Sequence, residues 1–152
     1  MSASKLLLTK EDVAAMIPHA GDMCLLDGVL MWDADGISCI SASHHRRDNP
    51  LRVQDRLSVI NGIEYAAQAM AVHGALAGRA GSAPRAGYLA SVRDVVCRCR
   101  DLDELAGELT IDARRLLSDG DRVLYEFMLR AGDTLLLSGR AAVILDAAGA
   151  AP

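Results

Sequence analysis

Residues 57–78 read Leu-Ser-Val-Ile-Asn-Gly-Ile-Glu-Tyr-Ala-Ala-Gln-Ala-Met-Ala-Val-His-Gly-Ala-Leu-Ala-Gly, and Glu64 is the one charged residue among them. The length of this segment and its Ala and Met content favour a helix over a strand. A helix that is apolar on nearly all sides belongs inside a fold rather than on its surface. The sequence therefore predicts a central, buried helix that carries a single carboxylate.

Glu64 is the first candidate for chemistry. Burying an ionised carboxylate is costly unless the group is paired, hydrogen-bonded or protonated. We therefore expect Glu64 to be held protonated or to have dedicated partners, and either state suits proton transfer. Asn61 and Gln68 fall on the same narrow stripe of the helix, at i−3 and i+4 from the carboxylate. The stripe is either a polar network between packed elements or a catalytic carboxylate with amides that orient it or a substrate.

The bulk composition sets further limits. The chain has 152 residues and 16.1 kDa, which suits a single domain with a full core. We place that domain at residues 1–146 and expect residues 147–152 to form a disordered tail. The net charge of −4 argues against nucleic acid as the main partner. We find no metal-ligand spacing and no Gly-rich phosphate loop, so we expect no metal and no cofactor.

The sequence favours a cytoplasmic location. Residues 1–10 lack the apolar core and cleavage site of a secretory signal. The central segment contains Asn61, Glu64, Gln68 and His73, so we do not expect it to span a membrane. The four cysteines, at positions 24, 39, 97 and 99, form no CxxC pair and are expected to be reduced and packed.

Strand-like segments surround the predicted helix. Thr9-Lys-Glu-Asp12 resembles a capping box that opens a short helix ending near Met16. Two apolar runs joined by the turn at residues 33–36 predict a hairpin, and a polar loop over residues 44–56 follows it. The expected strands span residues 24–32, 37–43, 88–99, 109–117, 122–130 and 134–145. One antiparallel sheet curled around one helix gives an α+β fold, and its edges predict a dimer with a continuous sheet.

Two motifs resemble the 3-hydroxyacyl-acyl carrier protein dehydratases, which have the hotdog fold. The first is Ile17-Pro-His19 followed by Met23-Cys-Leu-Leu-Asp27, and the second is Gly62-Ile-Glu64-Tyr-Ala-Ala-Gln68-Ala. The second motif, with Gly87-Tyr-Leu89, is most similar to the predicted dehydratase branch of aryl-polyene-type biosynthetic clusters. The resemblance spans about residues 9–146 and implies a hotdog fold for the whole domain.

The chain departs from this family in the loop before the helix. The family carries a His-Phe-Pro-Gly loop there, and counting back from Glu64 by the family's spacing reaches Pro50, in the sequence Asn49-Pro50-Leu51. An asparagine cannot accept an α-proton as an imidazole can. Either His44 or His45 reaches the site from the same loop, or the usual base is missing.

The resemblance implies dehydration of 3-hydroxyacyl thioesters on acyl carrier protein, in fatty-acid or polyene-type biosynthesis. By this resemblance Glu64 is the general acid, and the other catalytic candidates are Gln68, His44 and His45. The candidates for substrate binding are Asn49, Asn61 and His19. His19 also has a structural interpretation, and His73, about half a turn around the helix from Glu64, is expected to be a packed or interface histidine.

The implied partners are an acyl carrier protein or a coenzyme A thioester, and a second subunit. In the family, base and acid come from different subunits, so a homodimer or a heterodimer with another hotdog dehydratase is expected. Two alternatives stay open. The chain is a non-catalytic subunit that binds acyl chains or assists an active dehydratase, or it is a hotdog acyl thioesterase in which Glu64 activates water.

Overall fold

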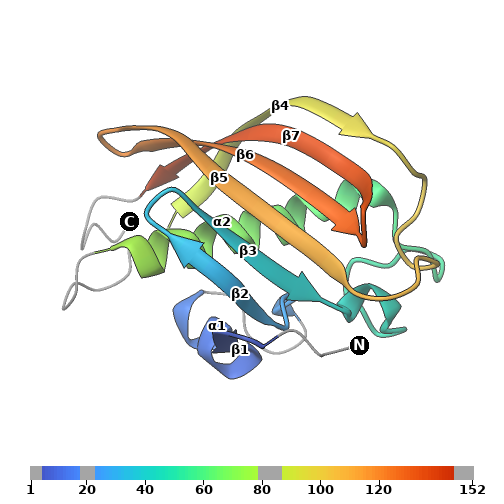
Figure 1. Cartoon of the computed structure of the whole chain (residues 1–152). Coiled ribbons are helices and arrows are strands. Elements are labelled where there is room, and N and C mark those ends of the chain that lie inside the picture. The colour runs from blue at the N-terminus through green and yellow to red at the C-terminus, as the bar shows by residue number, and fades with distance from the viewer. Residues whose placement is uncertain (1–4, 18–22, 79–86, 146–152) are drawn as a thin grey trace.

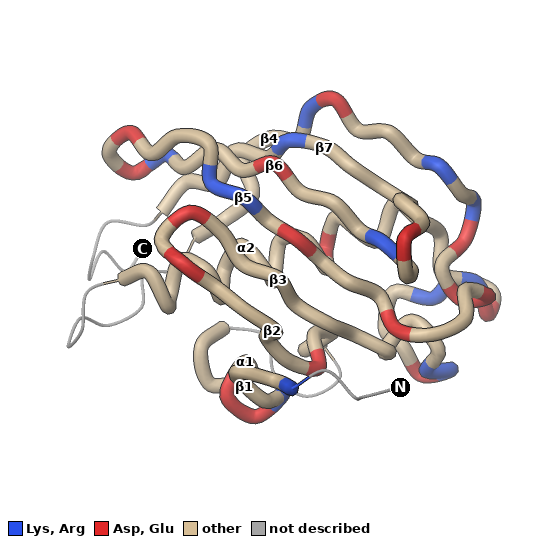
Figure 2. Tube along the Cα trace, in the orientation of Figure 1, with Lys and Arg blue, Asp and Glu red and all other residues tan. Residues whose placement is uncertain are grey.

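The apolar segment forms the helix that the sequence predicts. In a computed structural model, which describes residues 5–17, 23–78 and 87–145, a 3-10 turn η3 (Val59–Asn61) leads into α2 (Gly62–Ala77). Tyr65, Ala66 and Ala69 of α2 are fully buried. The charged residues gather in the turns and on the sheet, whereas α2 is almost free of them (Figure 2). The helix is therefore the centre of the core.

One antiparallel sheet curls around α2 (Figure 1). The order of its strands is β1-β2-β3-β5-β6-β7-β4. Their bounds are β1 Leu8–Thr9, β2 Gly28–Asp33, β3 Gly36–Ser41, β4 Gly87–Cys97, β5 Leu109–Asp119, β6 Arg122–Ala131 and β7 Thr134–Leu145. This arrangement confirms the predicted α+β hotdog architecture for the described residues.

The concave face of the sheet supplies the other half of the core. In β6, Val123, Tyr125, Phe127 and Leu129 are buried and alternate with less buried residues, as a period of two requires. Leu129 and Leu137 contact the start of α2 so closely that a Cβ on Gly62 would lie 2.8 and 2.6 Å from their Cδ2 atoms. The strand predicted over residues 122–130 is confirmed as β6, and one of its faces is buried.

Local signals at the amino end are also confirmed. Thr9 is the N-cap of the helix α1 (Lys10–Met16), and Thr9 and Asp12 form the capping box. The predicted hairpin is β2 and β3, and its turn is closed by Asp33 Oδ1, which accepts from the backbone N–H groups of Asp35 and Gly36 at 2.8 and 2.9 Å.

Four strand boundaries differ from the prediction by two residues or more: β2 starts at Gly28, β3 ends at Ser41, β4 ends at Cys97 and β5 ends at Asp119. Residues 24–26 are buried but precede β2, because the backbone N–H of Leu25 donates to the Gln68 side chain and its carbonyl accepts from serine hydroxyls. The strand expected over residues 88–99 ends at Cys97, where the chain turns toward residues 57–59. The predicted tail at residues 147–152 and His19 lie outside the described residues.

Strand β4 occupies an edge of the sheet. Tyr88 and Val96 in this strand are 55% and 44% exposed, and the strand pairs only with β7 among the described strands. A long unpaired strand edge is a surface on which a second sheet can continue.

In the described part of the chain, no helix is long and apolar enough to cross a membrane.

Candidate active site

Glu64 lies in the first turn of α2 and is half-buried. The Nε2 group of Gln68 lies 3.5 Å from Glu64 Oε1, one helical turn further along. A carboxylate in the first turn of a helix interacts favourably with the unpaired backbone N–H groups there. Glu64 is thus reachable from solvent and oriented by a neighbouring amide.

Gln68 is fully buried and anchors α2 to the chain that precedes β2. Its Oε1 accepts from the backbone N–H of Leu25 at 2.9 Å, and its Nε2 donates to the carbonyl of Met23 at 2.7 Å. Both the oxygen and the nitrogen of the Gln68 amide therefore have backbone partners, and the contact with Glu64 is the longest of its three hydrogen-bond contacts. This geometry suits an orienting role better than direct proton transfer.

Asn61 immediately precedes α2. It is half-buried, its backbone N–H donates to the carbonyl of Ser58 at 3.0 Å, and its side chain makes no capping hydrogen bond. Asn61 therefore stands one turn before Glu64, at the end of the helix where backbone N–H groups point outward.

Asn49 is part of a buried polar network. Its Nδ2 donates to the carbonyl of Ser43 at 2.9 Å and to the hydroxyl of Tyr65 at 3.1 Å, and its Oδ1 accepts from the N–H of Leu51 at 2.9 Å. Burial raises the pKa of Tyr65, so its hydroxyl keeps its proton. The Ser43 hydroxyl lies 2.8 Å from the Tyr65 hydroxyl and also donates to the carbonyl of Leu25. Both the nitrogen and the oxygen of the Asn49 amide therefore have partners within the chain.

The side chains of His44 and His45 contact a loop that lies about sixty residues further along the chain. They belong to the 3-10 turn η2 (Ser43–His45), and the Nε2 atoms of both rings lie next to the carbonyl oxygen of Leu105, at 3.1 and 2.5 Å. His44 is fully buried, whereas His45 is exposed. Both rings have a hydrogen-bond partner in the loop between β4 and β5, and no contact joins either ring to Glu64 or Gln68 in the described structure.

His73 is the packed histidine that the sequence suggests. It is fully buried, with Nδ1 at 2.7 Å from the Tyr125 hydroxyl and Nε2 at 2.9 Å from the carbonyl of Asp33. A carbonyl can only accept, so Nε2 carries the proton and Nδ1 accepts from Tyr125. Burial lowers the pKa of His73 and raises the pKa of Tyr125 to about 12, so the contact is between neutral groups.

Sequence reasoning did not identify Tyr65 and Ser43 as the residues that hold Asn49. A tyrosine next to the candidate acid in an otherwise aliphatic helix was the available signal, because a buried tyrosine hydroxyl requires a hydrogen-bond partner. Arg52 in this loop is also engaged, because it donates to the carbonyls of His44 and Asp55, each at 3.0 Å.

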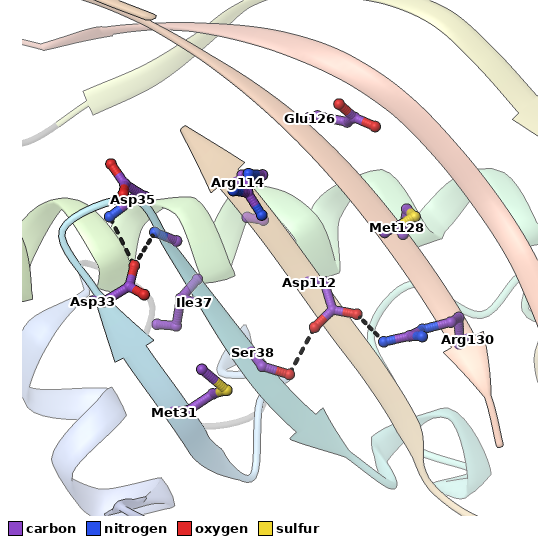
Figure 3. A pocket seen from close by; sticks show the side chains of 12 residues that line it. Met31, Asp33, Asp35, Ile37, Ser38, Asp112, Arg114, Glu126, Met128 and Arg130 are labelled. Atoms are coloured by element: carbon purple, nitrogen blue, oxygen red, sulfur yellow. Dashed lines mark hydrogen bonds and ion pairs between the residues drawn. The ribbon is translucent and has the colours of Figure 1, made fainter. Parts of the chain in front are cut away.

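A separate hollow of about 320 Å³ lies on the outer face of the sheet, across β2, β3, β5 and β6. Figure 3 shows Asp112 between Ser38 and Arg130, which it contacts at 2.7 and 2.5 Å. None of the predicted site residues lines this hollow. Within the described residues, no three or more His, Cys, Asp and Glu side chains are grouped to hold a metal ion.

Solved structures show the same fold. The chain is similar to the dehydratase heterocomplex ApeI:P from Xenorhabdus doucetiae, with a TM-score of 0.76 and 26% identity over 89% of this chain and 91% of that one. It is also similar to thioesterase HI1161 from Haemophilus influenzae, with a TM-score of 0.67 and 13% identity over 99% and 98% of the two chains. AziG from S. sahachiroi gives a TM-score of 0.58 and 17% identity over 86% and 97%. The last two likenesses concern the fold alone.

Comparison with protein families assigns the chain to a family as well as to a fold. No curated protein matches the chain. The sequence pattern of the ApeP-like family, described as ApeP dehydratase, matches residues 11–149, which include the central helix, the whole sheet from β2 onward and the Asn49 loop. With a match over most of its length, the chain belongs to the ApeP-like dehydratase family.

Proposed function

We propose that this chain takes part in the dehydration of 3-hydroxyacyl thioesters on acyl carrier protein, as one subunit of a hotdog dimer that contributes Glu64 as the general acid. The observation that carries the proposal is the half-buried Glu64 in the first turn of α2, with Gln68 beside it. Membership of a dehydratase family supports the reaction class.

The chemistry defines what the site must supply. Dehydration removes a proton from the α-carbon and expels the 3-hydroxyl group as water, which leaves a carbon–carbon double bond. A protonated Glu64 would give its proton to the departing hydroxyl. Backbone N–H groups at the amino end of α2 would donate to the thioester oxygen while charge develops on it. Both roles belong to the same end of the helix.

The base is the part that this chain does not offer in the described structure. Asn49 is committed to Ser43, Tyr65 and Leu51, and His44 and His45 contact Leu105 instead of Glu64. In the related dehydratases acid and base come from different subunits. We therefore favour a heterodimer in which a second hotdog dehydratase supplies an imidazole opposite Glu64, over a homodimer, in which the described residues supply none. The similarity to a dehydratase heterocomplex supports this assembly.

The edge strand β4 is the surface that we assign to the second subunit. It is 11 residues long, most of its side chains are exposed, and its outer backbone edge is free of any described strand. Pairing there would continue the sheet across both subunits. We also propose that the complex acts in the cytoplasm, in fatty-acid or polyene-type biosynthesis.

Mass spectrometry of a 3-hydroxyacyl carrier protein tests the proposal. The substrate is incubated with the chain alone, with a sister hotdog dehydratase alone, and with both. We expect loss of water to require the pair, and to be abolished by Glu64→Gln in this chain. Glu126→Gln, a change of the same kind on the outer face of the sheet, is the matched control and should leave turnover intact.

A second function, that of a non-catalytic partner subunit, is favoured by the committed Asn49 amide. It predicts that Glu64→Gln leaves the turnover of the complex unchanged while the chain still raises the activity or stability of its partner. The thioesterase alternative predicts release of free thiol from acyl-carrier or coenzyme A thioesters. Loss of water and release of the acyl group change the acyl-carrier mass differently, which separates dehydration from thioester hydrolysis. The effect of Glu64→Gln on water loss separates a catalytic subunit from a non-catalytic one.

A further inference from the structure

Two neighbouring imidazoles share one backbone acceptor. The Nε2 atoms of His44 and His45 lie 3.1 and 2.5 Å from the carbonyl oxygen of Leu105, and the two ring centroids are 3.8 Å apart. Since a carbonyl only accepts, both rings carry a proton on Nε2. The contact joins segments that are about sixty residues apart in the chain.

The His44 ring is placed where a second proton is costly. The residue is fully buried, and its Nδ1 has no hydrogen-bond partner. Among the described residues, the charged groups that act on the ring are His45 and Arg52, and both oppose a positive charge on it. Burial is the larger cause of a lowered pKa for His44, and hydrogen bonds to the backbone of Leu105 and Gly107 offset only part of it.

The carboxylates of the facing loop are engaged elsewhere. Arg56 pairs with Asp101 at 2.5 Å, and it lies 3.7 and 3.8 Å from Asp103 and Glu104. Asp103 also accepts from the backbone N–H of Leu57 at 2.9 Å. None of these carboxylates is among the groups whose charge acts on His44, so the loop offers no counter-charge to a protonated ring.

We propose that His44, His45 and the Leu105 carbonyl form a proton-sensitive latch, which holds residues 104–108 closed while His44 is neutral and releases them when it is protonated. The inference goes beyond the proposed function, because it requires neither a substrate nor a second subunit. Protonation places a charge and an unpaired N–H donor in a buried site. The ring must then leave the site to be solvated.

Release is confined to one end of the loop. Residues 100–102 are held by backbone hydrogen bonds that do not titrate: Val59 N–H donates to Arg100 at 3.0 Å, and Leu102 N–H donates to Leu57 at 2.7 Å. This anchor lies just before η3 and α2. When residues 104–108 open, the anchor at residues 100–102 stays in place. The opening then exposes to solvent the segment that leads into the amino end of α2.

The pH range follows from the direction of the shift. The closed latch binds a second proton on His44 less readily than the open latch does. The equilibrium therefore favours the closed latch most strongly above the ordinary histidine pKa of about 6.5. Its advantage falls as the pH drops below that value, by up to about tenfold per pH unit for a single proton. Acidification from pH 7.5 to 5.5 should therefore open the latch.

Hydrogen exchange of backbone amides, corrected for the intrinsic dependence of exchange on pH, tests the latch. The probe is the Leu105 amide, which donates to the carbonyl of Leu102 at 3.1 Å. We expect its protection to fall by up to about tenfold between pH 7.5 and 5.5. The Leu102 amide, which donates to the carbonyl of Leu57 in the anchor that stays closed, should keep its protection at both values.

Variants separate His44 from other titrating groups. In His44→Gln, where the side chain does not titrate, the Leu105 amide should show the same protection at both pH values, whether the loop is closed or open. His73→Gln, which alters the other buried histidine, should keep the wild-type response at Leu105. The inference is overturned if wild-type protection at Leu105 does not depend on pH, or if His44→Gln loses protection on acidification as the wild type does.

Discussion

Gly62 and Gly74 lie in the same helix, and the same substitution should affect stability in opposite directions at the two positions. A Cβ built on Gly62 lies 2.6 Å from Leu137 Cδ2 and 2.8 Å from Leu129 Cδ2, and both leucines are fully buried. A Cβ built on Gly74 meets no atom within 4 Å. We therefore expect Gly62→Ala to destabilise the protein and Gly74→Ala to stabilise it.

The magnitudes follow from the two environments. Forcing one methyl group into a close-packed core costs about 1–3 kcal/mol, because the leucine ends can move only against their own neighbours. Replacing glycine by alanine in an open helix position gains about 0.5–1 kcal/mol. The same gain offsets part of the cost at Gly62, so we expect a net loss there of about 1–2 kcal/mol.

Urea unfolding followed by circular dichroism measures both changes. The two variants and the wild type are compared at one protein concentration, since association contributes to apparent stability. The expected loss in Gly62→Ala corresponds to a fall in Tm of roughly 2–8 °C. A Gly62→Ala variant as stable as the wild type would refute the close contact between α2 and strands β6 and β7.

Two further predictions concern the buried polar groups. Tyr65→Phe should lower the free energy of unfolding by about 1–3 kcal/mol, because it removes a hydroxyl that accepts from the Asn49 amide and lies next to the Ser43 hydroxyl. A variant with the same urea unfolding curve as the wild type would contradict the hydrogen bonds among Asn49, Tyr65 and Ser43. Because burial lowers the pKa of His73, its contribution to stability is present above about pH 6.5 and is lost as the pH falls. The urea midpoint should therefore drop less between pH 7.5 and 5.5 in His73→Gln than in the wild type, and an equal drop in both would argue against this role.

The parts of the fold that sequence reasoning predicted are those specified by local patterns. The apolar run at residues 57–78, the strand over residues 122–130 and the turn at residues 33–36 each use interactions within a few residues. Strand β1 has two residues and exists through its pairing with Val29 and Gly28, so no period in its own sequence predicts it. Its existence depends on the completed sheet.

The loop after β3 shows the same limit. The run of two histidines and two arginines at residues 44–47 has the composition of a solvated loop, yet His44 is fully buried. Its Nε2 lies 3.1 Å from the carbonyl oxygen of Leu105, which comes just before β5, and β5 is the neighbour of β3 in the sheet. A contact between segments so far apart leaves no signal in the residues next to His44.

Asn49 shows what the loop before α2 gains from an asparagine. An asparagine amide has two N–H donors and a carbonyl oxygen, and here they bind Ser43, Tyr65 and Leu51 together. A neutral imidazole has one donor and one acceptor, so it cannot replace all three contacts. The residue therefore holds the loop against α2 more completely than a catalytic histidine would. In a heterodimer of the kind we propose, the second subunit supplies the base, and this chain can keep a rigid scaffold behind Glu64.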